Sequence, residues 1–297
     1  MKPDSTVIYF TVCLGTGYGI IVSLILIFFQ NEITIDQNIK LIIATISYFL
    51  IVSGLLSSTL HLGHPKRAWR ALSQWRSSWL SREGVAAIFT FAPLTLFFIF
   101  WIFTNYTKIT FLLLIISSIS SIVTTICTAK IYSSIKAIPA WNNPLVPIIY
   151  ILNSLVLGSL FAFTLLYYFQ IKINMLSNMI ISLSITTLFI KLLYWYSIRR
   201  PSNSNIATAT GLGSKEKTSF FEGPHTNKNF LSREMINKIN ASKSILLRIA
   251  VCIFTYITPS YYLLQRPYFV MNDYIISYTL IIISIIALIG MFIERYL

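Results

Sequence analysis

The chain has 297 residues, of which 56% are apolar and only 11% carry a charged side chain. Soluble globular proteins are charged at about a quarter of their positions, so this composition excludes a soluble protein and predicts an integral membrane protein. The formal net charge of +14 does not indicate nucleic-acid binding, because the basic residues lie in loops between apolar runs and not on one polar domain.

Eight segments are long and apolar enough to cross a bilayer as helices, which takes about 20 residues each. They are predicted at residues 7–29, 39–60, 84–104, 109–131, 145–169, 175–197, 245–265 and 272–293. The expected fold is an all-α bundle of eight transmembrane helices that forms a single membrane domain over residues 1–297. No small-residue cleavage site follows the first apolar run, so we expect it to remain as the first helix and not to act as a signal peptide.

The basic residues predict the orientation in the membrane, because Lys and Arg are enriched in cytoplasmic loops. Seventeen lie on the side of the N-terminus and four on the other side. Both termini are therefore expected in the cytoplasm. The long polar loop at 198–244 is on the same side, where it is either a docking surface for a partner or a solvated linker.

Small residues inside the apolar runs predict packing roles. Gly15-Thr-Gly17-Tyr-Gly19 neither follows a strand nor opens a soluble helix, so we expect close helix packing and not a dinucleotide site. Cys13, Cys127 and Cys252 show no paired spacing, which argues against an iron–sulfur centre or a structural zinc. A short echo, Trp79-Leu-Ser-Arg-Glu83 and Phe230-Leu-Ser-Arg-Glu234, leaves a duplicated four-helix unit as an open hypothesis.

The loop between the second and third predicted helices is the best candidate for a functional site. Residues 61–83 contain two of the three histidines, five of the 23 Lys and Arg residues and three of the six tryptophans. Antiparallel neighbours bring the end of one helix beside the start of the next, so His61 and Glu83 are expected to converge. Each residue alone also has a structural explanation: Glu83 suits the dipole of a helix start, and His61 can bond carbonyls at a helix end.

A His–carboxylate pair at a membrane interface can accept protons near neutral pH. Oxidation of a lipid-soluble quinol needs such acceptors, because its hydroxyls lose protons as electrons leave. His61 and Glu83 are therefore the candidate proton acceptors of this chain. The other charged residues in or near the helices, Lys191, Arg248 and Glu294, are expected to reach the surface from helix ends. No histidine lies in a helix centre, so bis-histidine haem ligation is not expected.

Several stretches carry a resemblance to a known family. Leu60–Trp69 followed by Ser77–Glu83 resembles the signature loop of the membrane anchor subunit of dimethyl sulfoxide reductase, the DmsC family. That family is related to the NrfD-type membrane subunits of polysulfide reductase. Further similar stretches are Lys130–Trp141, Gly223–Met235 and the C-terminal Glu294–Leu297.

The resemblance implies an anchor in the bacterial inner membrane that oxidises menaquinol during anaerobic respiration. Electrons would pass to an iron–sulfur subunit and a molybdopterin subunit, while the anchor holds no haem or metal and has no turnover alone. His61 and Glu83 fall on the quinol-binding positions of the family, so we predict that His61 accepts a quinol proton and that Glu83 orients His61 or relays the proton. His64, where the family usually has Ser, adds an imidazole that either assists or points to water, and Arg67 and Arg82 would position the site or bind the partner.

Two other functions stay open at this point. A secondary transporter or proton channel usually places ionisable or broken-helix sites near the midplane, where this chain has almost no charge. A purely structural anchor would lack a quinol site altogether.

Overall fold

The computed structural model describes residues 5–29, 35–60, 65–104, 107–136, 138, 140–198, 241–266 and 272–297, apart from the side chains of 65–68, 71 and 241. Within these residues, eight helical spans are long and apolar enough to cross a membrane. They are α1 (Ser5–Phe29), α2 (Gln37–Leu60), α3 (Trp79–Thr104), α4 (Lys108–Ser133), α5 (Leu145–Tyr168), α6 (Asn174–Ile198), the pair α8 (Ala241–Val251) and α9 (Thr258–Gln265), and α10 (Asp273–Tyr296). The predicted all-α membrane bundle is confirmed, and the largest shift is at α3, which begins at Trp79 and not at residue 84.

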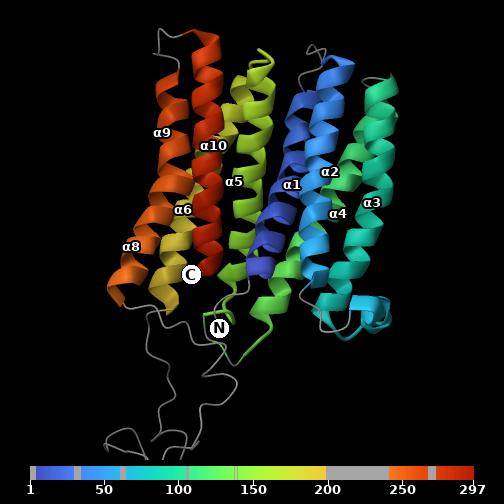
Figure 1. Cartoon of the computed structure of the whole chain (residues 1–297), viewed down its shortest axis with the longest axis vertical. Coiled ribbons are helices and arrows are strands. Elements are labelled where there is room, and N and C mark those ends of the chain that lie inside the picture. The colour runs from blue at the N-terminus through green and yellow to red at the C-terminus, as the bar shows by residue number, and fades with distance from the viewer. Residues whose placement is uncertain are drawn as a thin grey trace, which may run out of the picture.

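The spans run side by side along the long axis of the molecule (Figure 1). Helices α1 to α4 lie in one half and α6, α8, α9 and α10 in the other, and the halves meet where α1 packs on α5. Helix α1 begins and α10 ends at the same end of the bundle, which also carries the 3₁₀ segment η1 (Pro65–Gln74). The second copy of the Trp79–Glu83 echo, residues 230–234, lies outside the described residues, so the duplication stays a hypothesis.

Helix α1 is the centre of the bundle because its glycines let two neighbours approach. Of its most apolar stretch, 78% is buried, against 28% to 56% in the other seven spans. A Cβ on Gly19 would overlap the backbone carbonyl of Ser154 in α5, and a Cβ on Gly158 would overlap Gly19 in return. On the opposite side, a Cβ on Gly17 would lie 2.6 Å from Cγ1 of Ile51 in α2. The predicted close packing at these glycines is confirmed.

The seventh span is one helix with a π-helical segment, Cys252–Ile257, between α8 and α9. Pro259 explains it, since proline has no N–H and its ring displaces the carbonyl one turn earlier. The hydroxyl of Thr258 donates to the carbonyl of Ile253 at 2.8 Å across the widened turn. Tyr256, in the π-helical segment, donates to Oδ1 of Asn153 in α5 at 2.7 Å, which ties this span to the centre of the bundle.

Candidate functional site

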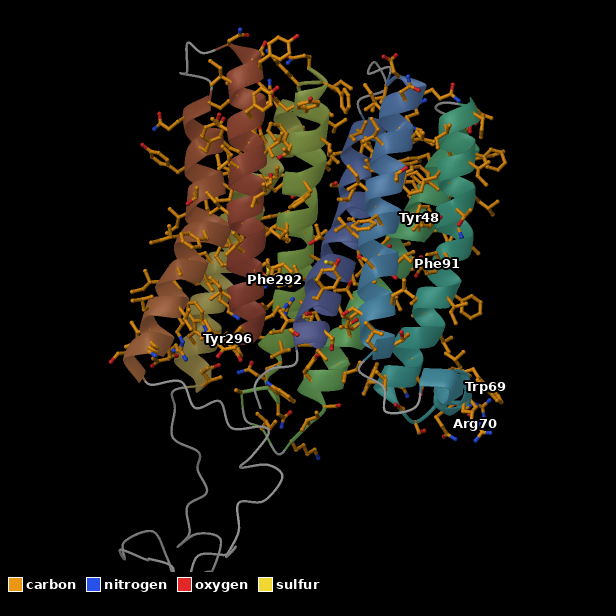
Figure 2. The ribbon with its side chains drawn as sticks, viewed as in Figure 1. Tyr48, Trp69, Arg70, Phe91, Phe292 and Tyr296 are labelled. Carbon is orange, nitrogen blue, oxygen red and sulfur yellow. The ribbon has the colours of Figure 1, made fainter. Side chains whose placement is uncertain are left out.

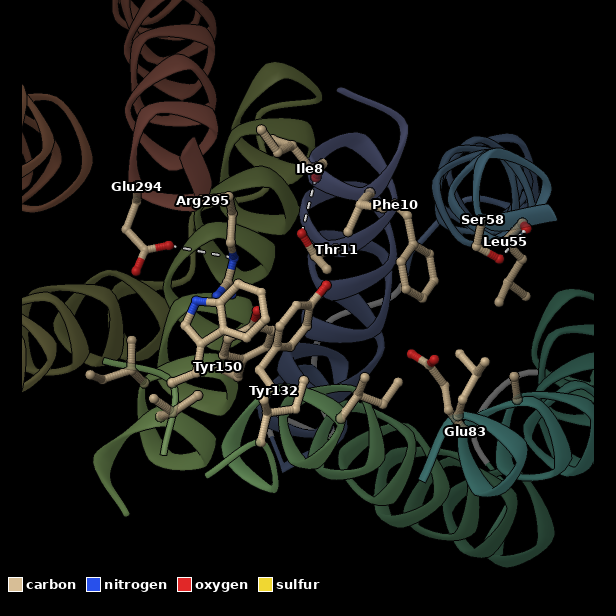
Figure 3. A pocket seen from close by; sticks show the side chains of 18 of the residues that line it. Ile8, Phe10, Thr11, Leu55, Ser58, Glu83, Tyr132, Tyr150, Glu294 and Arg295 are labelled. Atoms are coloured by element: carbon tan, nitrogen blue, oxygen red, sulfur yellow. Dashed lines mark hydrogen bonds and ion pairs between the residues drawn. The ribbon is translucent and has the colours of Figure 1, made fainter. Parts of the chain in front are cut away.

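A cavity of about 730 Å³ lies at the end of the bundle where α1 begins and α10 ends. All eight spans and η1 contribute to its wall, and most of the lining side chains are apolar or aromatic. The charged lining residues are Glu83, Lys191, Arg248, Glu294 and Arg295. Figure 3 shows Glu83 at one side of the cavity and the Glu294–Arg295 pair at the other, with Tyr132 and Tyr150 between them. The cavity therefore has two charged ends separated by aromatic rings.

Glu83 lies deeper in the bundle than its sequence position indicated. Because α3 begins at Trp79, Glu83 is in the second turn and only 4% exposed. The stabilisation of a carboxylate by the helix dipole falls off within the first turn, so the dipole does not explain Glu83. Its carboxylate accepts a hydrogen bond from the hydroxyl of Thr128 in α4.

The surroundings of Glu83 are mainly apolar. Phe10 and Leu55 lie on the same side of the cavity as Glu83 (Figure 3), and Ala87, one helical turn after Glu83 in α3, also lines the cavity. Among the described side chains, Glu83 makes no ion pair within 4 Å, and only the Thr128 hydroxyl bonds to it. Burying a carboxylate in a membrane helix costs free energy, and ionisable residues at such positions usually serve a function. Glu83 is therefore a candidate for proton chemistry.

The opposite end of the cavity holds a buried ion cluster that sequence reasoning missed. The ammonium of Lys191 in α6 bonds to the carboxylate of Glu294 in α10. The guanidinium Nε of Arg295 lies 3.4 Å from the other carboxylate oxygen of Glu294. The side chains of all three are no more than 8% exposed. The prediction that Lys191 and Glu294 reach the surface from their helix ends is wrong.

One signal for this cluster was present in the sequence. Lys191 and Glu294 have opposite charges, and each lies within about two turns of the end of its predicted span. With an even number of connections between them, these two helix ends lie at the same face of the membrane. The hydropathy pattern does not show that α6 and α10 turn these side chains towards a common cavity.

Aromatic rings connect the two ends of the cavity. The Tyr132 ring lies edge-to-face with Trp141, at 5.3 Å between ring centroids, and tilted against Tyr150, at 5.8 Å. The guanidinium of Arg295 lies 3.5 Å from the centroid of the Tyr150 ring. The face of an aromatic ring attracts a cation, so Tyr150 helps to hold Arg295 in place at the cavity wall.

The structure describes some of the predicted site residues and not others. His61, His64 and the third histidine, His225, lie outside the described residues, and of Arg67 only the backbone is described. The predicted convergence of His61 and Glu83 is therefore not tested. Arg82 is described, and it is not among the residues that line the cavity.

Arg82 turns towards the loop that precedes α3. Its Nε donates to the carbonyl of Trp75 at 2.9 Å, and a terminal nitrogen donates to the carbonyl of Arg76 at 2.7 Å. The guanidinium also lies 4.3 Å from the centroid of the Trp79 ring. Farther out, Trp69 and Arg70 project from η1 at the end of the bundle (Figure 2). The contacts of Arg82 brace the loop.

We expect Arg82→Ala to open this loop. Two hydrogen bonds from a charged group contribute on the order of 1 kcal/mol at a partly exposed site, which is about a fivefold larger open population. Limited trypsin digestion of the membrane-embedded protein should cleave after Arg76 about five times faster in the variant. An unchanged cleavage rate would contradict the bracing role of Arg82.

In the segments that the structure describes, no three His, Cys, Asp or Glu side chains gather as a metal site. The expectation that the chain holds no haem or metal stays a prediction. The cavity itself can offer hydrogen bonds from Lys191 and Arg295 and a proton-accepting carboxylate from Glu83 to an organic ligand.

Comparisons with known proteins identify similar subunits of oxidoreductases. A family model described as the DMSO reductase anchor subunit (DmsC) matches residues 1–297. The chain is 27% identical over 180 residues to a subunit of the sulfite dehydrogenase of Allochromatium vinosum, in an alignment that covers 56% of this chain and 54% of the relative. The match thus spans about half the length of that relative. No solved structure matches the chain significantly.

Proposed function

Since the chain belongs to the DMSO reductase anchor subunit (DmsC) family, we propose that it is the membrane subunit of a molybdoenzyme complex and that it oxidises menaquinol in the cavity around Glu83. The observation that carries this proposal is the buried Glu83 carboxylate, which lines a large, mainly apolar cavity in a membrane bundle. Binding sites for small organic molecules usually measure about 300–1,000 Å³ and combine apolar walls with few polar groups, as this cavity does.

The chemistry of quinol oxidation fits the groups in the cavity. A quinol becomes a quinone by losing two protons and two electrons. The Glu83 carboxylate accepts one proton from a quinol hydroxyl, and the Thr128 hydroxyl that donates to Glu83 keeps the carboxylate in position. The electrons pass to iron–sulfur clusters of a partner subunit, since this chain would hold no electron carrier of its own.

The residues of the preceding loop extend the proposed site. Thr59 lines the cavity near the end of α2, and His61 follows it two positions later in the chain. We propose that His61 takes part in proton acceptance with Glu83, as the resemblance of this loop implies. His64 and Arg67 are proposed to contribute to the same end of the quinol site, and Arg82 to hold the loop that carries them.

The proposed partners follow from the family and from the charge distribution. An iron–sulfur subunit and a molybdopterin subunit would receive the electrons, and the latter would reduce the terminal acceptor. The excess of Lys and Arg at the end of the bundle with η1 supports a cytoplasmic location of both termini in a bacterial inner membrane. The name of the A. vinosum relative likewise denotes one subunit of a larger oxidoreductase.

A transporter, a proton channel and a structural anchor remain the alternatives, and ligand binding separates them. Trp141 and Trp195 line the cavity, so a quinone bound there should quench their fluorescence. We expect menadione, a naphthoquinone without a prenyl tail, to quench saturably when added to the purified complex in lipid nanodiscs. Absence of saturable quenching, or purification of the chain from its native membrane without an iron–sulfur partner, would contradict the proposed function.

A further inference from the structure

Among the side chains that the structure describes, the buried ion cluster opposite Glu83 has more cations than anions. Lys191 and Arg295 face a single carboxylate, that of Glu294. A third cation, Arg248, also lines the cavity and lies 5.4 Å from the centroid of the Trp195 ring. The other described acids are Glu83 at the far side of the cavity, and Asp36 and Asp273 at helix starts near the opposite end of the bundle.

Aromatic rings hold Lys191 and Arg295 without adding negative charge. The ammonium of Lys191 lies 4.8 Å from the ring centroid of Tyr194 and 5.5 Å from that of Trp195. Arg295 lies on Tyr150. The π-face of an aromatic ring attracts a cation through its quadrupole, but it brings no negative charge. An excess positive charge in a membrane interior is costly, and an electron-rich ligand atom in the cavity would offset that cost.

An ion pair that only joined α6 to α10 would need one cation and no opening to a cavity. Here Lys191, Glu294 and Arg295 all line the cavity that also contains Glu83. The cavity thus has a proton-accepting end at Glu83 and a cationic, hydrogen-bond-donating end at Lys191 and Arg295. A quinol ring carries two oxygens on opposite sides, which matches two ends of different chemistry.

We propose that Lys191 and Arg295 form the cationic end of the ligand site, where they bind a headgroup oxygen of the quinol and stabilise negative charge on it. This inference rests on the proposed function, because it assigns a role within the same cavity. When the hydroxyl at this end loses its proton to the carboxylate of Glu294, which lines the same end of the cavity, the electron pair of the O–H bond remains on the oxygen. The cluster stabilises that charge until two electrons have left for the iron–sulfur partner and the oxygen has become a carbonyl.

The test compares an anionic with a neutral ligand of nearly the same shape. The purified complex in nanodiscs is titrated with 2-hydroxy-1,4-naphthoquinone, which is ionised at neutral pH, and with neutral menadione, and tryptophan quenching reports binding. The wild-type complex should bind the anion more tightly. Lys191→Met removes one cation and leaves Glu294 paired with Arg295, and we expect it to weaken binding of the anion about tenfold and that of menadione less.

Two further variants keep the experiment decisive. Lys191→Met/Glu294→Gln leaves no unpaired carboxylate and serves if the single variant does not assemble. Lys172→Met is the matched control, since Lys172 pairs with Asp273 at 2.7 Å near the opposite end of the bundle, and it should bind both quinones like the wild type.

The outcomes separate this inference from the proposed function. Equal wild-type affinity for the two quinones overturns the cationic end whatever the variants do. An unchanged preference for the anion in an assembled Lys191→Met complex overturns it as well and leaves Lys191 as a link between α6 and α10. If the wild type binds neither quinone, the proposed function fails and this inference fails with it.

Discussion

We expect Glu83→Gln to lower the rate of quinol-dependent turnover of the assembled complex at least about a hundredfold. A positioned general base contributes roughly 10²–10⁴-fold to a proton-transfer step, and an amide cannot accept the quinol proton. Gln keeps the size of Glu and can still accept the hydrogen bond from Thr128, so the helix pair α3–α4 should remain packed. The measurement is the rate of terminal acceptor reduction with menadiol as the electron donor.

Two controls show whether a loss is specific to the quinol site. A dye that reduces the partner subunits directly should support wild-type rates in the Glu83→Gln complex, because that route bypasses the cavity. Asp273→Asn changes an acid at the start of α10, near the opposite end of the bundle, and should leave menadiol oxidation unchanged. Wild-type menadiol turnover in the Glu83→Gln complex would remove Glu83 from the proposed mechanism.

The second large effect is expected at the crossing of α1 and α5. Gly19→Ala places a methyl group on the backbone carbonyl of Ser154, where no flexible side chain can move aside. Overpacking usually costs about 1–3 kcal/mol, and contact with backbone should place this variant at or above that upper value. Because α1 and α5 join the two halves of the bundle, we expect little folded protein in the membrane.

Gly84→Ala is the matched control for this prediction. The added methyl would meet only the end of the Leu72 side chain, at 3.2 Å. Alanine also favours a helix over glycine by about 1 kcal/mol, so stability should change little. Both variants are measured by the amount of protein in the membrane and by the thermal unfolding of the purified protein. Equal amounts and equal unfolding temperatures of the two variants would contradict the role given to the α1–α5 contact.

Local sequence properties were sufficient for the architecture of this chain. A span in a bilayer must satisfy its backbone hydrogen bonds internally, so a run of about 20 apolar residues predicts a helix with few alternatives. The glycines of α1 were also interpretable, since a small residue in such a helix has few other uses. The largest difference was the start of α3, because Trp79–Arg82 is polar enough to be taken for a loop although it forms the first turn.

For the candidate site, the sequence predicted one part and the tertiary structure decided the rest. The sequence by itself singled out Glu83, because acids are rare in this chain and Glu83 follows a loop rich in basic and aromatic residues. Its depth and its bond to Thr128 were decided by the packing of α3 on α4. The sequence placed Lys191 and Glu294 at the same face of the membrane, but their contact was decided by the tertiary structure. Hydropathy predicts which residues lie in the bilayer. The rotation of each helix about its axis depends instead on contacts between distant residues, such as Lys191 and Glu294, which are 103 positions apart.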